Sequence, residues 1–177
     1  LILRDESLQI ADPVLKGGGQ ERGLRAGTEN VAAIAGFGAA AAEVAQQLPA
    51  ERERMAKLRD RLEDGLRAIA PDTVIFGAAA DRLPNTTLFA VAGIKAETAL
   101  IALDLEGIAV SSGAACSSGK VGPSHVLAAM GVAPGLARGA IRTSIGHGTT
   151  PEEIERFLQA WRKCLGVLLR SRGAIAA

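Results

Sequence analysis

The sequence predicts a domain that combines a β-sheet with helices, of the α/β or α+β class. Hydrophobic residues make up 48% of the 177 residues, which is enough to build a core. Apolar residues at spacings of three and four mark an amphipathic helix over residues 50–70. Beyond that helix, short strand-like runs alternate with helical segments. Such alternation is typical of layered domains of sheet and helices.

The first part of the chain begins with residues 1–4, "LILR", which have the composition of a short strand. A glycine loop follows, and the alanine-rich run from Thr28 to about residue 47 predicts a helix with Thr28 as its N-cap. Pro49 is expected to end this helix. We therefore place a boundary near residue 48 and divide the chain into parts 1–48 and 49–177.

The second part begins with the amphipathic helix, whose charged residues cover the face opposite Met55, Leu58, Leu62, Leu66 and Ile69. Pro151 suits the first turn of the last helix, because N–H groups in the first turn have no hydrogen-bond partner within the helix and proline lacks only such a group there. The other elements follow from composition. They are strands at 73–77, 85–91, 108–112 and 140–145, and helices at 95–105, 123–130 and 151–169.

Charge and composition argue against several classes of partner. The chain has 20 Lys+Arg against 19 Asp+Glu, and aromatic residues make up 3%, so it lacks the basic, aromatic-studded face that binds nucleic acid. The uncharged apolar run at 31–42 is shorter than the roughly 18 to 20 residues that cross a bilayer. The two cysteines form no disulfide framework, which fits the reducing cytoplasm. The chain opens without Met and reads as a fragment.

The glycine loop at residues 15–30 matches neither nucleotide-binding signature. Arg22 stands where G-x-G-x-x-G, counted from Gly17, requires glycine, and no G-x-x-x-x-G-K-[ST] occurs. Arg22, Arg25 and Thr28 nevertheless lie at an expected helix start, where free N–H groups and the helix dipole favour an anion such as phosphate. A plain glycine turn with a solvated arginine pair is the alternative.

The stretch "AVSSGAACSSGK" places Cys116 among small residues that offer a thiol little apolar surface. Gly113 and Gly119 bracket it, so the segment is able to move. A reactive thiolate needs a cationic neighbour, and Lys120 and His125 are candidates. An inert, buried cysteine is the alternative. Cys164, among apolar residues of the last helix, is expected to be such a core residue without chemistry.

Arg142 lies between strand-forming residues, so its side chain projects from a rigid element. The planar guanidinium binds a carboxylate with two parallel hydrogen bonds, as recognition of an amino acid requires. A structural salt bridge is the alternative. His125 and His147 are expected at the surface or as caps, and the scattered histidines and cysteines predict no intrinsic metal site.

Three long stretches carry a resemblance to a known family: "GGGQERGLRAGTENVAAIAG", "AVSSGAACSSGKVGPSHVLAAMG" and "GAIRTSIGHGTTPEEI". In this order and at these separations they resemble the C-terminal part of the pyridoxal-phosphate-dependent cysteine desulfurases of the NifS/IscS group, within the class V aminotransferases. The resemblance implies the α/β architecture of the PLP-dependent transferases of fold type I. Residues 1–48 then correspond to the end of the large PLP-binding domain, and residues 49–177 to the small α+β domain with the cysteine loop.

The resemblance also implies roles for three residues. Cys116 matches the nucleophile that takes sulfur from L-cysteine, which leaves a persulfide and L-alanine, and a mobile loop allows the sulfur to reach an acceptor. Arg142 matches the arginine that holds the substrate carboxylate. Thr28 matches the residue that contacts the cofactor phosphate of the neighbouring subunit in a homodimer. The serines around Cys116 resemble the long-loop NifS/IscS branch.

One departure limits what this chain does alone. The family's cofactor lysine lies in a Ser-x-His-Lys motif, and neither His125 nor His147 is followed by lysine. We expect that lysine upstream of Leu1, so the chain by itself is expected to be inactive. The implied partners are an iron-sulfur scaffold or another sulfur acceptor, for cluster assembly or tRNA thiolation, with Cys116 as a transient ligand of a 2Fe-2S cluster. A stand-alone sulfur carrier, a dimerisation or scaffold domain, and a selenocysteine lyase of the same fold are alternatives.

Overall fold

The structure is a computed structural model that describes residues 12–113 and 124–175 of the chain. The predicted strand at residues 1–4 and the predicted cysteine loop around Cys116 lie outside the described residues. The contacts within the chain divide it into two units, Leu1–Gln47 and Leu48–Ala177.

The first unit contains a short 3-10 turn, η1 (Gln20–Gly23), and the start of the long helix α1 (Val31–Ile69). The predicted N-cap is wrong: Asn30, and not Thr28, caps α1, because its Oδ1 accepts a hydrogen bond from the Ala33 N–H at 3.1 Å. Asparagine is as good an N-cap as threonine or better, which accounts for the start of the helix at Val31.

Pro49 does not end the helix, and the predicted break there is wrong. Helix α1 continues through this position and contains Pro49 in its interior. Proline removes one N–H···O bond, whereas the alanine and glutamate residues on both sides, and the arginines after it, favour helix. The unit boundary after Gln47 therefore falls inside a helix.

The N-terminal part of α1 is apolar and exposed. Val31, Ile34 and Phe37 all lie at the surface, and among the described residues α1 is the helix long and apolar enough to cross a membrane. A single helix of this kind is weak evidence for a membrane span, because core helices of soluble proteins and signal sequences are also long and apolar enough. The sequence-based expectation of no membrane partner stays a prediction.

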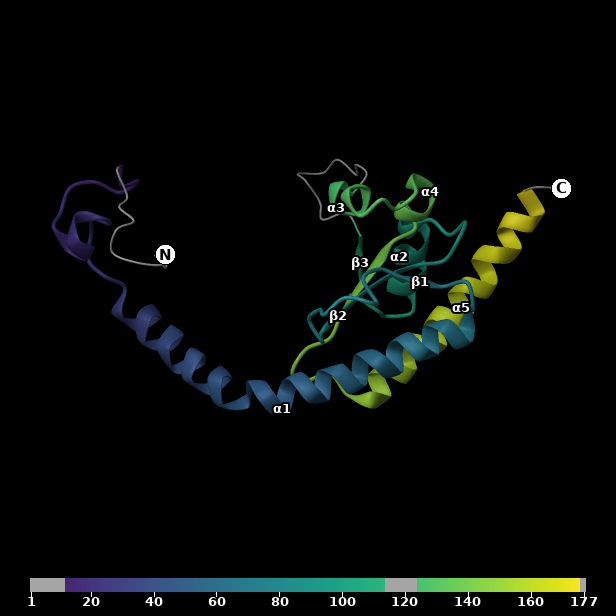
Figure 1. Cartoon of the computed structure of the whole chain (residues 1–177), viewed down its shortest axis with the longest axis horizontal. Coiled ribbons are helices and arrows are strands. Elements are labelled where there is room, and N and C mark those ends of the chain that lie inside the picture. Colours follow the sequence, from purple (N-terminus) through teal and green to yellow (C-terminus); the bar gives the residue numbers. More distant parts are fainter. Residues whose placement is uncertain (1–11, 114–123, 176–177) are drawn as a thin grey trace. The chain divides into compact units, whose positions relative to one another are not determined.

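The second unit is built on an antiparallel sheet, which makes it α+β (Figure 1). The strand order is β1-β2-β4-β3, with bounds Val74–Ile75, Thr86–Ala90, Ser111–Ser112 and Ile141–Ser144. All four strands lie within the predicted ranges but are shorter. In the central pair, Leu88 lies opposite Arg142, which in turn lies opposite Ser111 of β3.

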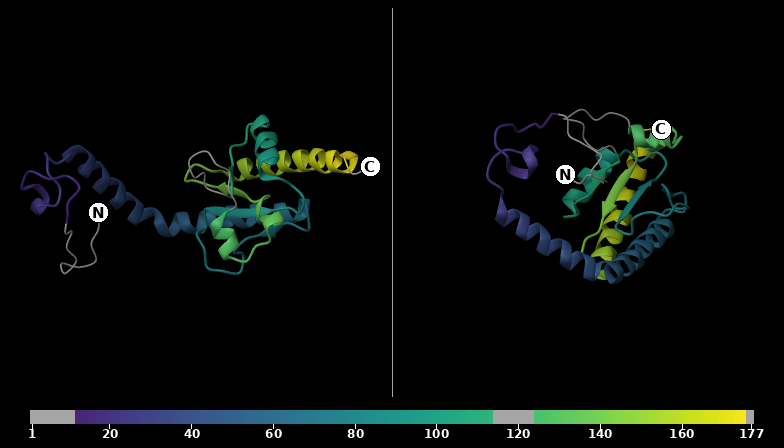
Figure 2. Two further views of the ribbon diagram at one scale, coloured as in Figure 1. Left: turned by 90° about the horizontal axis from the view of Figure 1, so that it is seen from above. Right: turned by 60° about the vertical axis from the view of Figure 1, so that its left-hand side comes forward.

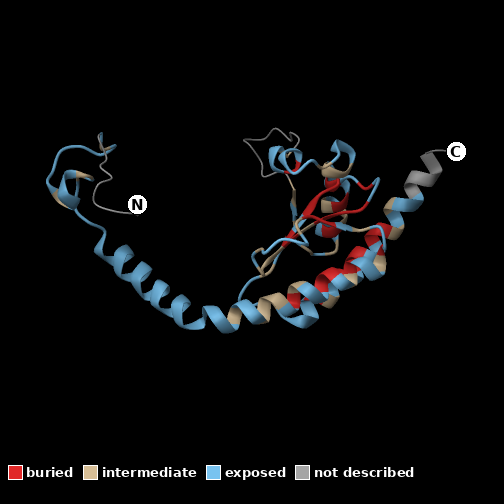
Figure 3. Cartoon of the chain, in the orientation of Figure 1, coloured by how far each residue is buried: buried red, intermediate tan, exposed pale blue. Residues whose placement is uncertain are grey.

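One face of the sheet packs on helices and forms the main core (Figures 2 and 3). The C-terminal half of α1, helix α2 (Ala96–Leu105) and helix α5 (Pro151–Ile175) supply the apolar side chains. Trp161 is fully buried there, edge-to-face with Phe89 at a centroid distance of 5.3 Å. The predicted apolar face of residues 50–70 is confirmed, since Leu58, Leu62 and Leu66 are buried.

The other sheet face carries a smaller apolar cluster, because successive strand residues point to opposite sides. Ala90, Ala140 and Phe76 pack there with Leu127 of helix α3 (His125–Ala129). Helix α4 (Pro134–Ala137) follows and was not predicted, although Pro134 at its first turn is a start signal. Helix α5 runs past the predicted end at residue 169.

A buried charge cluster ties α1 to the sheet. Glu63 of α1 is 4% exposed, and its Oε1 accepts hydrogen bonds from Arg82 and, at 2.8 Å, from the Thr87 hydroxyl. Arg82 also donates to the Thr86 carbonyl at 3.1 Å. The buried carboxylate therefore has both a charged and a neutral donor, as a buried ion pair requires.

Replacing Glu63 by alanine is expected to lower the free energy of unfolding by about 3 kcal/mol, because Arg82 is left without its carboxylate. Urea unfolding followed by circular dichroism measures this loss. Glu53→Ala is the matched control, since Glu53 forms an exposed pair with Lys57 on the same helix and is expected to cost about 0.5 kcal/mol or less. Equal losses in the two variants would contradict the assignment.

Candidate functional site

Arg142 projects from β4 on the face opposite the main core. Along β4 the burial alternates, with Ile141 and Thr143 buried and Arg142 and Ser144 exposed. Among the residues that the structure describes, none forms an ion pair or hydrogen bond with the Arg142 guanidinium. The structural salt bridge that the sequence left open as an alternative therefore has no partner in the described part of the chain.

The strand that leads toward Cys116 lies directly beside Arg142. Ser111 of β3 pairs with Arg142, and two residues later the Gly113 N–H donates to the Ala140 carbonyl at 2.7 Å. A Cβ on Gly113 would lie 2.6 Å from the Ala140 Cβ, so glycine is required for this close approach. Residues 111–113 are therefore held against β4 by main-chain hydrogen bonds, although Cys116 itself lies outside the described residues.

Thr28, the predicted phosphate contact, is exposed in the first unit. Its carbonyl accepts a hydrogen bond from Arg25 Nη1 at 3.3 Å, and the same nitrogen donates to the Gly27 carbonyl at 3.2 Å. Arg25 therefore stabilises the loop before α1. Gly27 has a φ of 94°, a left-handed conformation that favours glycine, which gives this loop its turn.

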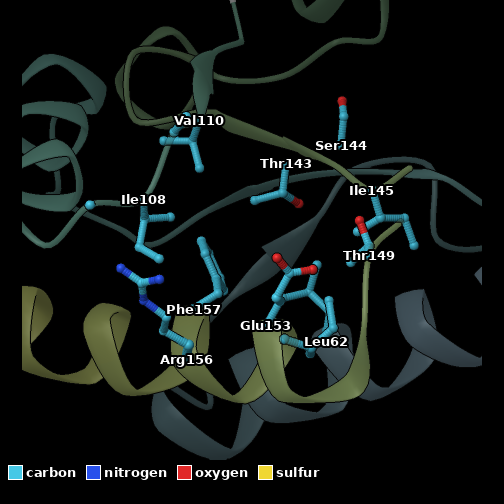
Figure 4. A pocket seen from close by; sticks show the side chains of 13 residues that line it. Leu62, Ile108, Val110, Thr143, Ser144, Ile145, Thr149, Glu153, Arg156 and Phe157 are labelled. Carbon is cyan, nitrogen blue, oxygen red and sulfur yellow. The ribbon is translucent and has the colours of Figure 1, made fainter. Parts of the chain in front are cut away.

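A small cavity lies at the edge of the sheet, beyond the last β3–β4 pair (Figure 4). It has a volume of about 240 Å³ and opens where residues 108–110 separate from residues 143–145. Glu153 and Arg156 of α5 reach it from below. Arg142 does not line the cavity, although Ser144, two residues further along β4, does.

The two histidines and Cys164 complete the set of candidate residues that the structure describes. His125 is exposed at the start of α3, where Ser124 caps the helix, and His147 is exposed with Nδ1 at 3.2 Å from Glu51. Cys164 is buried as predicted, and desolvation raises the pKa of its thiol. In residues 12–113 and 124–175, no group of His, Cys, Asp and Glu has the arrangement of a metal site.

Comparison with known proteins identifies the family to which this chain belongs. Residues 1–157 match the family model "Aminotransferase class-V". The chain belongs to that family.

Within the family, the chain is similar to cysteine desulfurases. It is 46% identical over 147 residues to cysteine desulfurase NifS of Azotobacter vinelandii, which covers 83% of this chain and 37% of that protein. It is 41% identical over 154 residues to cysteine desulfurase IscS of Clostridium botulinum, with 86% of this chain and 39% of that protein covered. The chain thus spans less than half the length of these relatives.

Solved structures agree with this assignment of the fold. The NifS-like protein from Rickettsia africae aligns with a TM-score of 0.79 and 39% sequence identity over 90% of this chain and 41% of that chain. The predicted architecture, part of a PLP-dependent transferase fold, is confirmed. Sequence reasoning did not foresee the Gly113–Ala140 contact beside Arg142, because a close backbone approach leaves no signal in the sequence other than a glycine.

Proposed function

We propose that this chain is the C-terminal part of a cysteine desulfurase that converts L-cysteine to L-alanine and leaves a persulfide on Cys116. One observation carries the proposal. Arg142 has no carboxylate partner among the described residues, and it lies beside Ser111, on the strand that leads toward Cys116. The similarity to NifS and IscS cysteine desulfurases supports it.

In the proposed reaction the substrate is bound by Arg142 and attacked by Cys116. A carboxylate accepts two parallel hydrogen bonds from a guanidinium, which fixes the orientation of an amino acid. Two residues, Ala114 and Ala115, separate Gly113 from Cys116 in the sequence, so the Cα atoms of Gly113 and Cys116 lie at most about 11 Å apart. This limit supports the proposal that Arg142 and Cys116 act on one substrate.

The sulfur transfer balances without an external oxidant. The Cys116 thiolate attacks the sulfur of the bound cysteine, an S–S bond forms, and the Cβ–S bond of the substrate breaks. The electron pair of the broken bond remains on the carbon skeleton, which takes up a proton and leaves as alanine. Pyridoxal phosphate, when bound, supplies the electron sink for the substrate carbon atoms.

The cofactor is held in part by residues outside this chain. Thr28, exposed before α1, is assigned to the cofactor phosphate of a neighbouring subunit, so the active protein is a homodimer. The lysine that binds the cofactor lies in an upstream segment, since no Ser-x-His-Lys occurs here. Residues 1–48 then belong to the large domain and residues 49–177 to the small domain. We use the term extended protein for this chain joined to that upstream segment.

The persulfide is passed on in the cytoplasm to a sulfur acceptor. An iron-sulfur scaffold or a tRNA-thiolation protein has the chemistry to accept a sulfane sulfur from Cys116, and Cys116 is also a transient ligand for a nascent 2Fe-2S cluster. The sequence from Gly113 to Gly119 contains only Gly, Ala, Ser and Cys, and glycine, which restricts the backbone least, stands at both ends.

An activity assay tests the proposed function. The extended protein, supplied with pyridoxal phosphate and L-cysteine, is expected to release alanine, whereas the 177-residue chain alone is expected to release none. Selenocysteine in place of cysteine tests the lyase alternative. No alanine from the extended protein, or a strong preference for selenocysteine, would refute the proposal.

A further inference from the structure

Arg54 of α1 binds the turn that follows β4. Its guanidinium donates hydrogen bonds to the carbonyl oxygens of His147 and Thr149, both at 2.7 Å, and of Gly146 at 3.1 Å. The same side chain pairs with both carboxylate oxygens of Glu51 at 3.0 Å. One side chain thus ties three main-chain carbonyls of the turn to α1.

The turn depends on such outside contacts. Gly146 and Gly148 flank His147, and glycine loses more backbone entropy on ordering than any other residue. Inside the turn, the Gly146 N–H donates to Thr149 Oγ1 at 2.9 Å and the Thr149 N–H donates to the Gly146 carbonyl at 3.1 Å. Arg54 adds three charge-assisted bonds to these two.

Glu51 holds Arg54 in place. The Arg54 guanidinium keeps the pKa of Glu51 below its usual range, and His147, whose Nδ1 lies 3.2 Å from Glu51 Oε2, adds to the effect. The carboxylate therefore stays charged and orients the guanidinium toward the turn.

The turn continues directly from the end of β4. The β3–β4 pairing ends at Ser111 and Arg142, and beyond it residues 108–110 separate from residues 143–145 around the cavity of Figure 4. Past Arg142, β4 is held on the β2 side, where the Ile145 N–H donates to the Asn85 carbonyl at 2.9 Å. The next segment of the chain is the turn at residues 146–149, which the hydrogen bonds from Arg54 hold against α1.

We propose that Arg54 is a positioning residue for substrate binding: by fixing residues 146–149 it fixes the end of β4 and hence the direction of the Arg142 guanidinium. This inference rests on the proposed function, in which Arg142 binds the substrate carboxylate. Arg54 acts through the main chain and touches neither substrate nor cofactor.

The substitution Arg54→Lys tests this role most specifically. Lysine keeps the positive charge beside Glu51 but is a compact point charge, and it cannot reproduce the planar fork that reaches three carbonyls. In the extended protein we expect the KM for L-cysteine to rise about tenfold while kcat changes less than about threefold. We also expect faster hydrogen exchange of the amides of residues 141–149.

Arg61→Lys is the matched control. Arg61 lies on the same helix and also ties α1 to the C-terminal part of the chain, through Glu155 of α5 at 2.8 Å, without contacting the turn. It is expected to leave both KM and the exchange of residues 141–149 unchanged. In an Arg142→Lys background, Arg54→Lys is expected to add no further rise in KM, because neighbouring effects on one interaction are not additive.

Two outcomes would overturn the inference: unchanged exchange at residues 141–149 in Arg54→Lys, or a rise in KM that persists in full when Arg142 is already lysine. An extended protein that makes no alanine before any substitution would refute the proposed function, and the exchange measurement would still decide whether Arg54 orders the turn. The two failures are therefore distinguishable.

Discussion

Replacing Cys116 by serine in the extended protein is expected to lower alanine formation from L-cysteine by on the order of 10³-fold or more, because the nucleophile of the sulfur transfer is lost. A serine hydroxyl is a much weaker nucleophile at neutral pH and cannot carry a sulfane sulfur. Binding of pyridoxal phosphate is expected to remain, since the proposed roles of Cys116 do not include holding the ring. Alanine release and cofactor absorbance measure the two effects separately.

Cys164→Ala is the matched control for this prediction. Cys164 is 4% exposed among the apolar residues of α5, and burial raises the pKa of its thiol, so it holds little thiolate. The variant is expected to keep the activity. Activity that survives Cys116→Ser, or that is lost in Cys164→Ala without loss of the folded state, would contradict the assignment of the nucleophile.

Replacing Arg142 by lysine is expected to lower kcat/KM for L-cysteine by about 10² to 10³-fold, mostly through KM. A lysine keeps the charge but loses the two parallel hydrogen bonds to a carboxylate, and a hydrogen bond to a charged group contributes about 1.5 to 3 kcal/mol. Steady-state kinetics of the extended protein over a wide range of cysteine concentrations gives the two parameters.

Arg156→Lys is the control that separates the exposed face of β4 from the cavity. Arg156 lies on α5, lines the cavity of Figure 4 and, like Arg142, has no ion-pair partner in the described part of the chain. If Arg156→Lys raised KM as much as Arg142→Lys, the cavity would be the substrate site and our assignment would be wrong.

Much of the fold could be predicted from periodicity. The apolar face carrying Leu58, Leu62 and Leu66 was visible in the sequence because helix spacing places these residues on one side. The continuation of α1 through Pro49 was not, since the helix-forming residues around it outweigh the loss of one hydrogen bond. The burial of Glu63 was also not predicted, because its partner Arg82 lies in a distant loop.

The candidate site could be predicted in part. The alternation around Arg142 already indicated a side chain projecting from a strand, and the structure gives it an exposed place opposite Ser111. The contacts of Arg54 with the turn at residues 146–149 join positions more than 90 residues apart in the sequence, a pairing that no local pattern encodes. The roles of Cys116 and Thr28 came from the resemblance to a family and stay predictions.

Mass spectrometry of the extended protein after incubation with L-cysteine shows whether Cys116 carries the transferred sulfur. We predict a gain of about 32 Da, one sulfur atom, on the peptide that contains Cys116, and its removal by a thiol reductant. Alanine formation with no such gain on that peptide, or with the gain on the peptide that contains Cys164, would contradict it.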